Sequence, residues 1–528
     1  MPNVVEVTDF AGGLNLRDKP DAVKPNEATD LLNVVFDRRG AVAQREGYAV
    51  FTSSALTNRV DSLAPFYQTN GTKQLIAGCG TRLEAINASG GVVASATGLA
   101  GGPYSIARFG SAASEYAYCA NGSDVLQRWS GAAWAAPTHT VDGVGGRTSP
   151  KPLYVAVQPK DNRLVAAGYS NATGGPNGAT AGYEYVYFSE AGNPESWLTT
   201  NYVRLVPNDG EKIQGVCVFR DDLYVFKETK FFKFYGNTTS STGQPVFNYT
   251  TIDAGVGLAS PRALAVTKDG VYFLARNGVY RTTGSDPVLV SDQITPFFES
   301  RTDASFSSSG LNVANITAAS MASWNNRIYV SVPTGSSTTN DRVLVYDPEY
   351  KWWSVWNFVA SALCSFRISS GDELVFGYAT GSNHVARHSS SYTNDAGTAI
   401  SSRWRSGWTE YGGGSVVRSR QIKFWGRAQL NVGVGVDYVI SSASNNLDFT
   451  GNTVLWGNSA STTLWGTSTS STLWGPGPVV NVDMFREGRR GTVFQLVFEN
   501  TEKDQSWAVT KADYHLAGTR IPGVAEVD

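Results

Sequence analysis

KDGVYFLARNGVYRTTG (Lys268–Gly284) contains two short runs of alternating side chains, and a two-residue turn signal precedes each run. The turn signals are Asp269-Gly270 and Asn277-Gly278, whose residues tolerate the positive φ angles of a tight turn. Alternation with a period of two, bounded by such turns, indicates short antiparallel strands. The stretch therefore predicts a β-hairpin.

The same pattern of turn and strand recurs along the chain. It occurs as RDDLYVFKETKFFKFYG at 220–236 and as GDELVFGYATGSNHVARHS at 371–389, and other copies carry Gly-rich or Ser/Thr-rich insertions. The first apolar strand residues of the seven copies are Leu75, Tyr116, Leu164, Leu223, Val271, Ile328 and Leu374. An irregular period of roughly 40–50 residues, with several strands in each unit, is typical of a β-propeller. We therefore predict an all-β chain with a β-propeller of six to seven blades, some of them irregular. An all-β sandwich with accessory strands is the alternative.

The composition fits a rigid all-β protein and argues against several classes. Glycine (55 residues) and aromatic residues (12%) are abundant, whereas 17% of residues are charged, against a usual ~25%. A net charge of −2 supplies no broad basic field for binding nucleic acid by counter-ion release. We interpret the four widely spaced cysteines as small buried side chains of a protein made in a reducing compartment. We expect neither a membrane span nor a secretory signal.

The rhythm of the sequence divides the chain into three parts. Residues 1–60 are expected to form an arm that packs on the C-terminal part, with a short helix from Asn26 to Leu32 and a hairpin that turns at Gly40. The repeat units occupy 61–395 and form the propeller. Residues 396–528 contain alternating strands with a different rhythm, which predict a β-sandwich or platform domain.

Two groups of residues are candidates for a subunit interface. Leu-Trp-Gly recurs at regular spacing, with its indoles at Trp456, Trp465 and Trp474. Trp is favoured at interfaces, and the alternative is three turns that each pack one Trp against the sheet. The second group comes from two stretches in which basic residues cluster, one of them beside Trp. It comprises Arg403, Trp404, Arg486 and Arg489. We expect these side chains to face a partner or solvent rather than to stack on nucleic-acid bases.

Candidate catalytic and metal-binding groups are few. His384 and His388 would pair on a helix, but four residues of a strand span ~13 Å, which is too far for one ion. Asp221 and Asp222 enter a strand at a turn, where acidic residues commonly serve turn geometry. The sequence has no sialidase Asp-box, WD40 signature, Walker loop, GxSxG or HExxH motif. We therefore expect no enzyme activity, no metal and no cofactor.

Several stretches occur in an order shared with a known family. GGLN is followed by a run that contains Asn33, Gly40, Arg45, Gly47 and Tyr48. A later unit contains Ser189, Asn193, Pro194 and Trp197. GVGLASPRALAVTKDG…VSDQITPFF (Gly255–Phe298) and the closing DYHLAGTR complete the order. Together these stretches resemble bacteriophage tail proteins of the nozzle, or packaged-DNA-stabilisation, type. The resemblance covers most of the chain and its motifs are structural, but the Leu-Trp-Gly triplet has no counterpart in it.

The resemblance implies a structural virion protein, a tail nozzle or hub. Such proteins form a homo-oligomeric ring, commonly of six copies, through which double-stranded DNA is ejected without sequence recognition during host cell entry. The ring would contact a tail adaptor, portal or tail-tube proteins and would anchor fibres or spikes. It would be assembled in the cytoplasm of the host bacterium.

Two other functions stay open at this point. One is a host-surface carbohydrate-binding or glycosidase propeller, suggested by the abundant aromatic residues and by the loop at 171–182. The other is a cytosolic scaffold of the WD40 kind.

Overall fold

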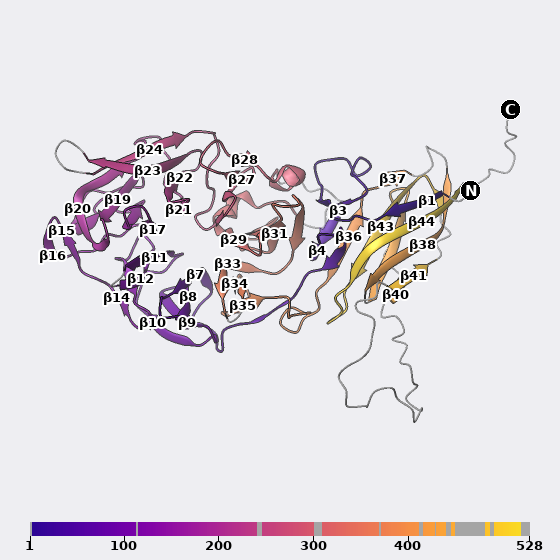
Figure 1. The fold of residues 1–528 in the computed structure, drawn as a ribbon, viewed down its shortest axis with the longest axis horizontal. Coiled ribbons are helices and arrows are strands. Elements are labelled where there is room, and N and C mark those ends of the chain that lie inside the picture. The colour runs from indigo at the N-terminus through magenta and orange to yellow at the C-terminus, as the bar shows by residue number, and fades with distance from the viewer. Residues whose placement is uncertain are drawn as a thin grey trace, which may run out of the picture.

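The computed structural model describes residues 3–111, 114–239, 245–299, 309–368, 371–410, 416–427, 429–439, 445–448, 481–485 and 490–518. The described strands form nine sheets. Figure 1 shows seven of these sheets arranged in a ring and the other two packed beside it. The fold-class prediction, a β-propeller with a β-sandwich, is confirmed.

Each of the seven ring sheets is one blade of the propeller. Blade 1 consists of β7 (Val60–Tyr67), β8 (Lys73–Cys79), β9 (Arg82–Asn87) and β10 (Val92–Ala96), and blade 2 of β11 (Ser105–Ser111), β12 (Ser114–Ala120), β13 (Gln127–Trp129) and β14 (Trp134–Ala135). Blade 3 consists of β17 (Tyr154–Gln158), β18 (Arg163–Ala167), β19 (Tyr185–Glu190) and β20 (Asn193–Arg204). Two extra strands, β15 (His139–Val141) and β16 (Val144–Arg147), extend blade 3 at its edge. Blades 4 and 5 consist of β21 (Gly215–Phe219), β22 (Asp222–Phe226), β23 (Phe231–Thr239) and β24 (Pro245–Ile252); and β25 (Leu264–Thr267), β26 (Gly270–Ala275), β27 (Gly278–Thr282) and β28 (Val288–Leu289). Blades 6 and 7 consist of β29 (Ser320–Trp324), β30 (Arg327–Val332), β31 (Arg342–Tyr346) and β32 (Trp353–Trp356); and β33 (Ala360–Arg367), β34 (Asp372–Tyr378), β35 (Val385–His388) and β6 (Tyr48–Val50).

The first strands of successive blades contact one another around the ring, and β33 of blade 7 contacts β7 of blade 1. The ring is therefore closed. Each of the seven apolar residues used to measure the sequence period lies in the second strand of a different blade. The period arises because one blade cannot bury its own faces and each blade packs on its neighbours.

Hydrophobic clusters fill the spaces between neighbouring blades. Separate clusters lie between blades 7 and 1, 1 and 2, 2 and 3, 3 and 4, and 4 and 5. A larger cluster joins blades 5, 6 and 7 to the β-sandwich formed by the other two sheets. The propeller and the sandwich therefore share one core.

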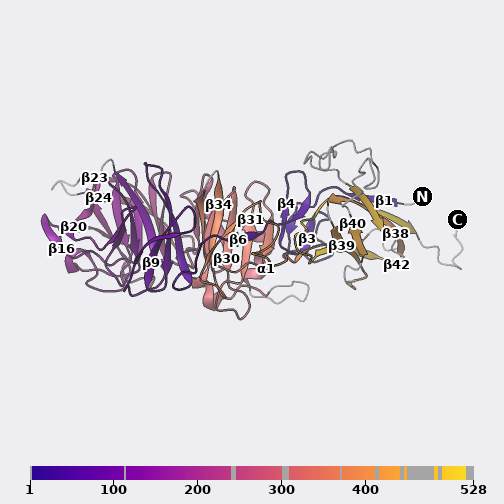
Figure 2. The same cartoon turned by 90° about the horizontal axis from the view of Figure 1, so that it is seen from below.

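The sandwich is made from both ends of the chain. One sheet contains β4 (Val34–Phe36), β5 (Val42–Gln44), β44 (Ala508–Gly518), β38 (Val417–Arg427) and β41 (Asn481–Phe485), with β1 (Asn3–Val7) and β42 (Arg490–Gly491) paired to it. The other contains β2 (Gly13–Leu14), β3 (Glu27–Leu32), β36 (Ser402–Ser406), β43 (Val493–Asn500), β39 (Gln429–Val436) and β40 (Asn445–Asp448), with β37 (Thr409–Glu410) paired to β43. The rings of Phe424 and Phe498 meet between the sheets at 5.6 Å. Figures 1 and 2 show that the sandwich extends from one edge of the ring, beside blade 6.

The short helix predicted from Asn26 to Leu32 is wrong. Glu27–Leu32 is strand β3, which lies between β2 and β36 and is buried along most of its length. The helix-start signal at Asn26 and Glu27 is local, whereas pairing on both edges and burial are tertiary and override it. The hairpin predicted around Gly40 is present as β4 and β5. Residues 1–60 are not one unit, because 3–44 supply strands to the sandwich and β6 belongs to the propeller.

Short helices are confined to loops. They are the 3₁₀ helices η1 (Pro176–Gly178), η2 (Asp292–Ile294) and η3 (Val313–Ala318) and the helix α1 (Thr295–Phe298). No helix in the described part of the chain is long and apolar enough to cross a membrane.

Arg262 ties four blades together at one end of the ring. It precedes β25 of blade 5, and its guanidinium donates to the carbonyls of Ala318 before blade 6, Ser361 in blade 7 and Asp61 in blade 1. The guanidinium of Arg262 therefore bridges four consecutive blades on one face of the propeller.

Candidate functional site: the junction of propeller and sandwich

The chain passes from the sandwich into the propeller through a junction built from Asn33, Arg45, Gly47 and Tyr48, with Asn357 and Asp395 opposite them. Asn33 is fully buried and has a φ of 54°, a left-handed conformation that Asn adopts more readily than most residues. Its amide nitrogen donates to Asn357 Oδ1 at 2.7 Å and to the Ser401 carbonyl at 2.6 Å. Asn33 thus holds the end of blade 6 and the start of the returning C-terminal segment in one place.

The Arg45 guanidinium is fully buried, and all five of its N–H groups have acceptors. Nε donates to Asn33 Oδ1 at 2.9 Å, and the two Nη atoms bind the Asp395 carboxylate as a fork at 2.9 and 2.7 Å. The remaining donors reach the Glu46 carbonyl and Asn357 Oδ1. Bidentate pairing of this kind fixes orientation as well as charge. Arg45 therefore connects the sandwich-side segment to the residues that follow blade 7.

Gly47 and Tyr48 begin the strand that completes blade 7. A Cβ at Gly47 would lie 2.0 Å from the Asn394 carbonyl oxygen, so no larger side chain fits. The Tyr48 ring packs edge-on against Phe376 at 5.1 Å, and β6 pairs antiparallel with β35. The outer strand of the last blade is thus supplied by the N-terminal part of the chain.

The sandwich covers the outer strand of blade 6. Ser354 Oγ and Trp356 Nε1 in β32 both donate to the Val34 carbonyl, at 2.6 and 3.2 Å. Gly13 approaches the same strand so closely that a Cβ would lie 2.6 Å from Trp352 Cβ, and its φ is 75°. An edge strand that exposes unpaired backbone groups invites other pairings. Here the sandwich covers the edge strand β32 in place of another partner.

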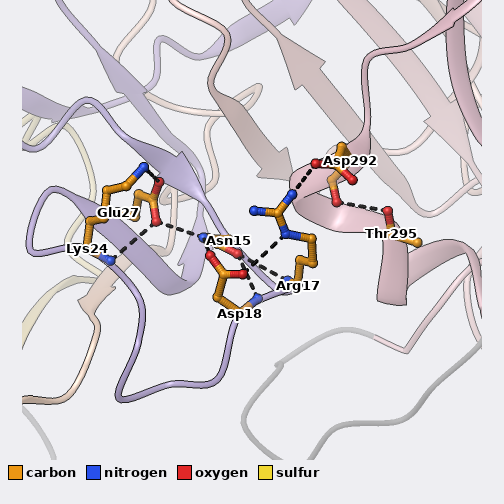
Figure 3. Close-up of polar contacts among 7 residues, drawn as sticks. All are labelled: Asn15, Arg17, Asp18, Lys24, Glu27, Asp292 and Thr295. Carbon is orange, nitrogen blue, oxygen red and sulfur yellow. Dashed lines mark hydrogen bonds and ion pairs between the residues drawn. The ribbon is translucent and has the colours of Figure 1, made fainter.

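Figure 3 shows a second contact between the arm and the propeller, formed by seven polar residues. Arg17 forms an ion pair with Asp292 in η2, and the Leu16 and Arg17 amides donate to the Gln293 carbonyl at 2.8 and 3.1 Å. Asn15 donates to Glu27 at 2.7 Å and to Asp18 at 2.9 Å. The contacts of Leu16 and Arg17 hold the segment that follows GGLN against η2, and the Asn15 bonds brace that segment within the arm.

Charge in this contact is balanced by neighbouring groups. The hydrogen bond from Asn15, followed by that from Arg17, lowers the pKa of the Asp18 carboxyl. The hydrogen bond to Asp18 and the charge of Asp292 raise the pKa of Arg17. Both groups are solvent-exposed, so we attribute to them orientation of the arm rather than much stability.

The predicted interface residues separate into two sets. Trp456, Trp465, Trp474, Arg486 and Arg489 lie outside the described residues. Trp404 is fully buried and stacks on Phe498 at 5.1 Å inside the sandwich, so the expectation that its indole faces a partner or solvent is wrong. Arg403 Nε lies 2.8 Å from the buried Asp30 carboxylate and is partly exposed.

The two histidines and two aspartates considered as candidate site residues form contacts that stabilise the fold. His384 contacts Thr52 at 2.9 Å, and His388 contacts the Gly47 carbonyl at 2.9 Å inside the core. Asp222 forms ion pairs with Lys160 at 2.6 Å and Lys233 at 3.1 Å, next to a turn in which Asp221 has a φ of 66°. Across the ranges that the structure describes, no three His, Cys, Asp or Glu side chains gather as a metal site. All four cysteines are buried and free.

The blade-3 motif also has a structural role. Trp197 is fully buried, and its indole Nε1 donates to His139 Nδ1 at 2.7 Å. Burial lowers the pKa of His139 to about 4, so this imidazole is neutral and accepts the bond. Ser189 Oγ accepts from the Leu164 amide at 2.9 Å. The bond from Trp197 to His139 attaches the extra strand β15 to the main sheet of blade 3, and the bond from Leu164 to Ser189 joins β18 and β19 within that sheet.

Arg45 lies within a motif that the sequence reveals, but its partner Asp395 lies 350 residues away and was not predicted. Arg262 lies in one of the quoted stretches, but its role was not predicted either. Neither role has a local signal, because Asp395 and the three carbonyls that Arg262 binds come from distant parts of the chain.

Fold and junction together define a seven-bladed β-propeller joined to a two-sheet β-sandwich by a buried polar network. No family model matches the chain, and no curated protein matches it. Among solved structures, one described as a streptogramin B lyase is similar over 65% of this chain and 97% of its own, at 8% identity and a TM-score of 0.37. BamB from Moraxella catarrhalis is similar over 74% of this chain and 99% of its own, at 13% identity and a TM-score of 0.34. These similarities carry no argument about activity.

Proposed function

We propose that the protein is a structural subunit of a bacteriophage tail, of the nozzle or hub type. The observation that carries this proposal is the position of the residues on which the resemblance rests. Asn33, Arg45, Gly47 and Tyr48 build the junction, and Leu16 and Arg17, which directly follow GGLN, bind η2 in the stretch that ends VSDQITPFF. Motif residues far apart in sequence therefore serve one architecture, a propeller fixed to a sandwich.

This architecture suits a wall component. Separate hydrophobic clusters hold the blades together, and the largest cluster continues into the sandwich. Relative motion of the two parts would have to open that shared core, which makes the subunit stiff. A stiff subunit with one elongated axis can occupy a fixed place in a ring, where identical head-to-tail contacts repeat around a closed axis.

In this proposal, DNA passes between subunits along the axis of the ring. A chain with a net charge of −2 gives a DNA duplex little to bind through counter-ion release. Passage without retention is therefore consistent with the composition.

The test is assembly of the purified chain. Mass photometry over a concentration series, with negative-stain images of the same samples, is expected to show closed rings, either alone or after addition of the tail adaptor of the same virion. Six copies are expected. Monomers under both conditions would contradict the proposal.

A further inference from the structure

An open cleft of about 690 Å³ lies between the hairpin turns of blades 5, 6 and 7. Its main polar and aromatic lining residues are Lys268, Asp269, Trp324, Asn325, Asn326 and Asp372. Thr267, also in the lining, ends β25, whereas Arg262 precedes the beginning of that strand. The cleft therefore opens on the face opposite Arg262. Its volume falls in the ~300–1,000 Å³ range usual for small-molecule sites.

Trp324 is a fixed aromatic surface in this cleft. The indole Nε1 donates to the Asp372 carbonyl at 2.6 Å, which ties blade 6 to blade 7. The ring packs against Tyr329 at 6.0 Å and His388 at 5.4 Å. Part of Trp324 remains exposed. An aromatic side chain that is already held in place loses little conformational freedom when a ligand packs on it.

Solvent-accessible polar side chains without an intramolecular partner surround Trp324. Among the residues that the structure describes, the side chains of Lys268, Asp269, Asn325, Asn326 and Ser365 have no hydrogen-bond or ion-pair partner, and all five line the cleft. They offer amide, ammonium, carboxylate and hydroxyl groups, and therefore both donors and acceptors. A ligand that carries many hydroxyl groups can use all of them.

The charges in the cleft are balanced. Lys268 and Asp269 are adjacent and opposite in sign, and the Asp372 carboxylate is bound by Arg367 at 2.9 Å. The cleft therefore has no excess of cations that would favour a phosphate or a nucleic acid. Polar groups arranged around an aromatic face suit a pyranose, whose C–H face packs on the indole while its hydroxyls form hydrogen bonds.

We propose that this cleft binds a neutral saccharide. The inference does not depend on the virion role, because it rests on the lining of blades 5 to 7 alone. It assigns binding and no chemical step.

The test uses the full chain and neutral hexasaccharides of α- and β-linked glucose, galactose, mannose and N-acetylglucosamine. Saturation-transfer NMR identifies which of these probes bind, and calorimetric titration measures affinity. At least one probe is expected to bind. Trp324→Ala is expected to weaken that binding at least tenfold.

Two further variants keep the test decisive if Trp324→Ala does not fold. Asn325→Gly and Asn326→Gly remove the amides at φ angles of 48° and 59°, which glycine adopts without strain, and each is expected to weaken binding about threefold. Trp134→Ala is the matched control, because this partly buried indole of blade 2 also donates to a carbonyl of the neighbouring blade, that of Ala94 in blade 1, at 3.2 Å. It is expected to bind like wild type.

Three results would overturn the inference: no probe binds, the glycine variants bind like wild type, or the control loses binding equally. Mass photometry of the same variants measures ring formation independently of saccharide binding. A failure of saccharide binding is thereby distinguished from a failure of assembly.

Discussion

Replacing Arg45 with methionine tests whether the junction holds the propeller and sandwich together. Methionine keeps most of the apolar stem but removes the five N–H donors. The Asp395 carboxylate, whose side chain is 12% exposed, loses its bidentate partner, and Asn33 Oδ1 loses one of its two donors. Removing one member of a buried ion pair typically costs about 3–5 kcal/mol. Because Asp395 retains some contact with solvent, we expect a loss of about 3 kcal/mol, the lower end of that range.

The loss should be measured where the junction opens. Amide hydrogen exchange followed by mass spectrometry reports local opening, so it does not require two-state unfolding of a large chain. The informative amides are Asn33, which donates to the Val355 carbonyl, and Gly47, which donates to the Tyr392 carbonyl. Their free energy of opening is expected to fall by about 3 kcal/mol in Arg45→Met.

Arg38→Met is the matched control. Arg38 makes an ion pair with Glu349 at 3.8 Å, but the two side chains are 77% and 56% exposed. The same substitution there is expected to change stability by no more than about 0.5 kcal/mol. In a double-mutant cycle, Arg45→Met and Asp395→Asn should be coupled by more than about 1 kcal/mol. Equal effects at Arg45 and Arg38, or additivity with Asp395→Asn, would refute the reasoning.

Three further predictions follow from other contacts. Gly47→Ala would place a Cβ 2.0 Å from the Asn394 carbonyl oxygen and should lower the melting temperature markedly. Gly236→Ala is the control, because its Cβ would meet nothing within 4 Å and should leave the melting temperature unchanged. Similar melting curves for the two variants would contradict this prediction. Arg262→Met leaves three carbonyls without this donor and should lower the free energy of unfolding by about 1–3 kcal/mol in urea titrations, and an unchanged midpoint would count against its proposed role. Burial lowers the pKa of His388 to about 3, so below about pH 6.5 the unfolded chain takes up a proton there that the folded chain does not, and stability falls as the pH falls. Between pH 7 and pH 5 this fall should be about 2 kcal/mol smaller in His388→Gln than in wild type, as measured by unfolding at both pH values.

Much of the propeller was predictable because its blades are built from local hairpins. Turns such as Asp269-Gly270 and Asn277-Gly278 are encoded by adjacent residues, and β26 and β27 pair with their sequence neighbours. The closing strand β6 was not predictable in this way. Its partner β35 lies more than 300 residues away, and the sequence of Tyr48–Val50 does not indicate that this strand pairs with blade 7.

Strand β3 illustrates the same limit from the other direction. Asn26 followed by Glu27 and by residues that tolerate a helix resembles a helix start. In the structure Glu27 is used differently, because its carboxylate accepts from Asn15 and contacts Lys24 at 3.2 Å. Trp404 was similarly judged from its neighbour Arg403, but alternate residues of β36 face opposite sides of the sheet. A basic neighbour therefore says little about the burial of a strand residue.

The position of the junction connects closure of the propeller to formation of the sandwich. Arg45 follows β5 of the sandwich directly, and only two residues separate it from β6, the strand that completes blade 7. Over so short a span, the segment cannot pair with β35 unless β5 is already near blade 7. The sandwich in turn covers β32 through Val34. Closing the ring and covering its exposed edge therefore depend on the same short segment of the chain.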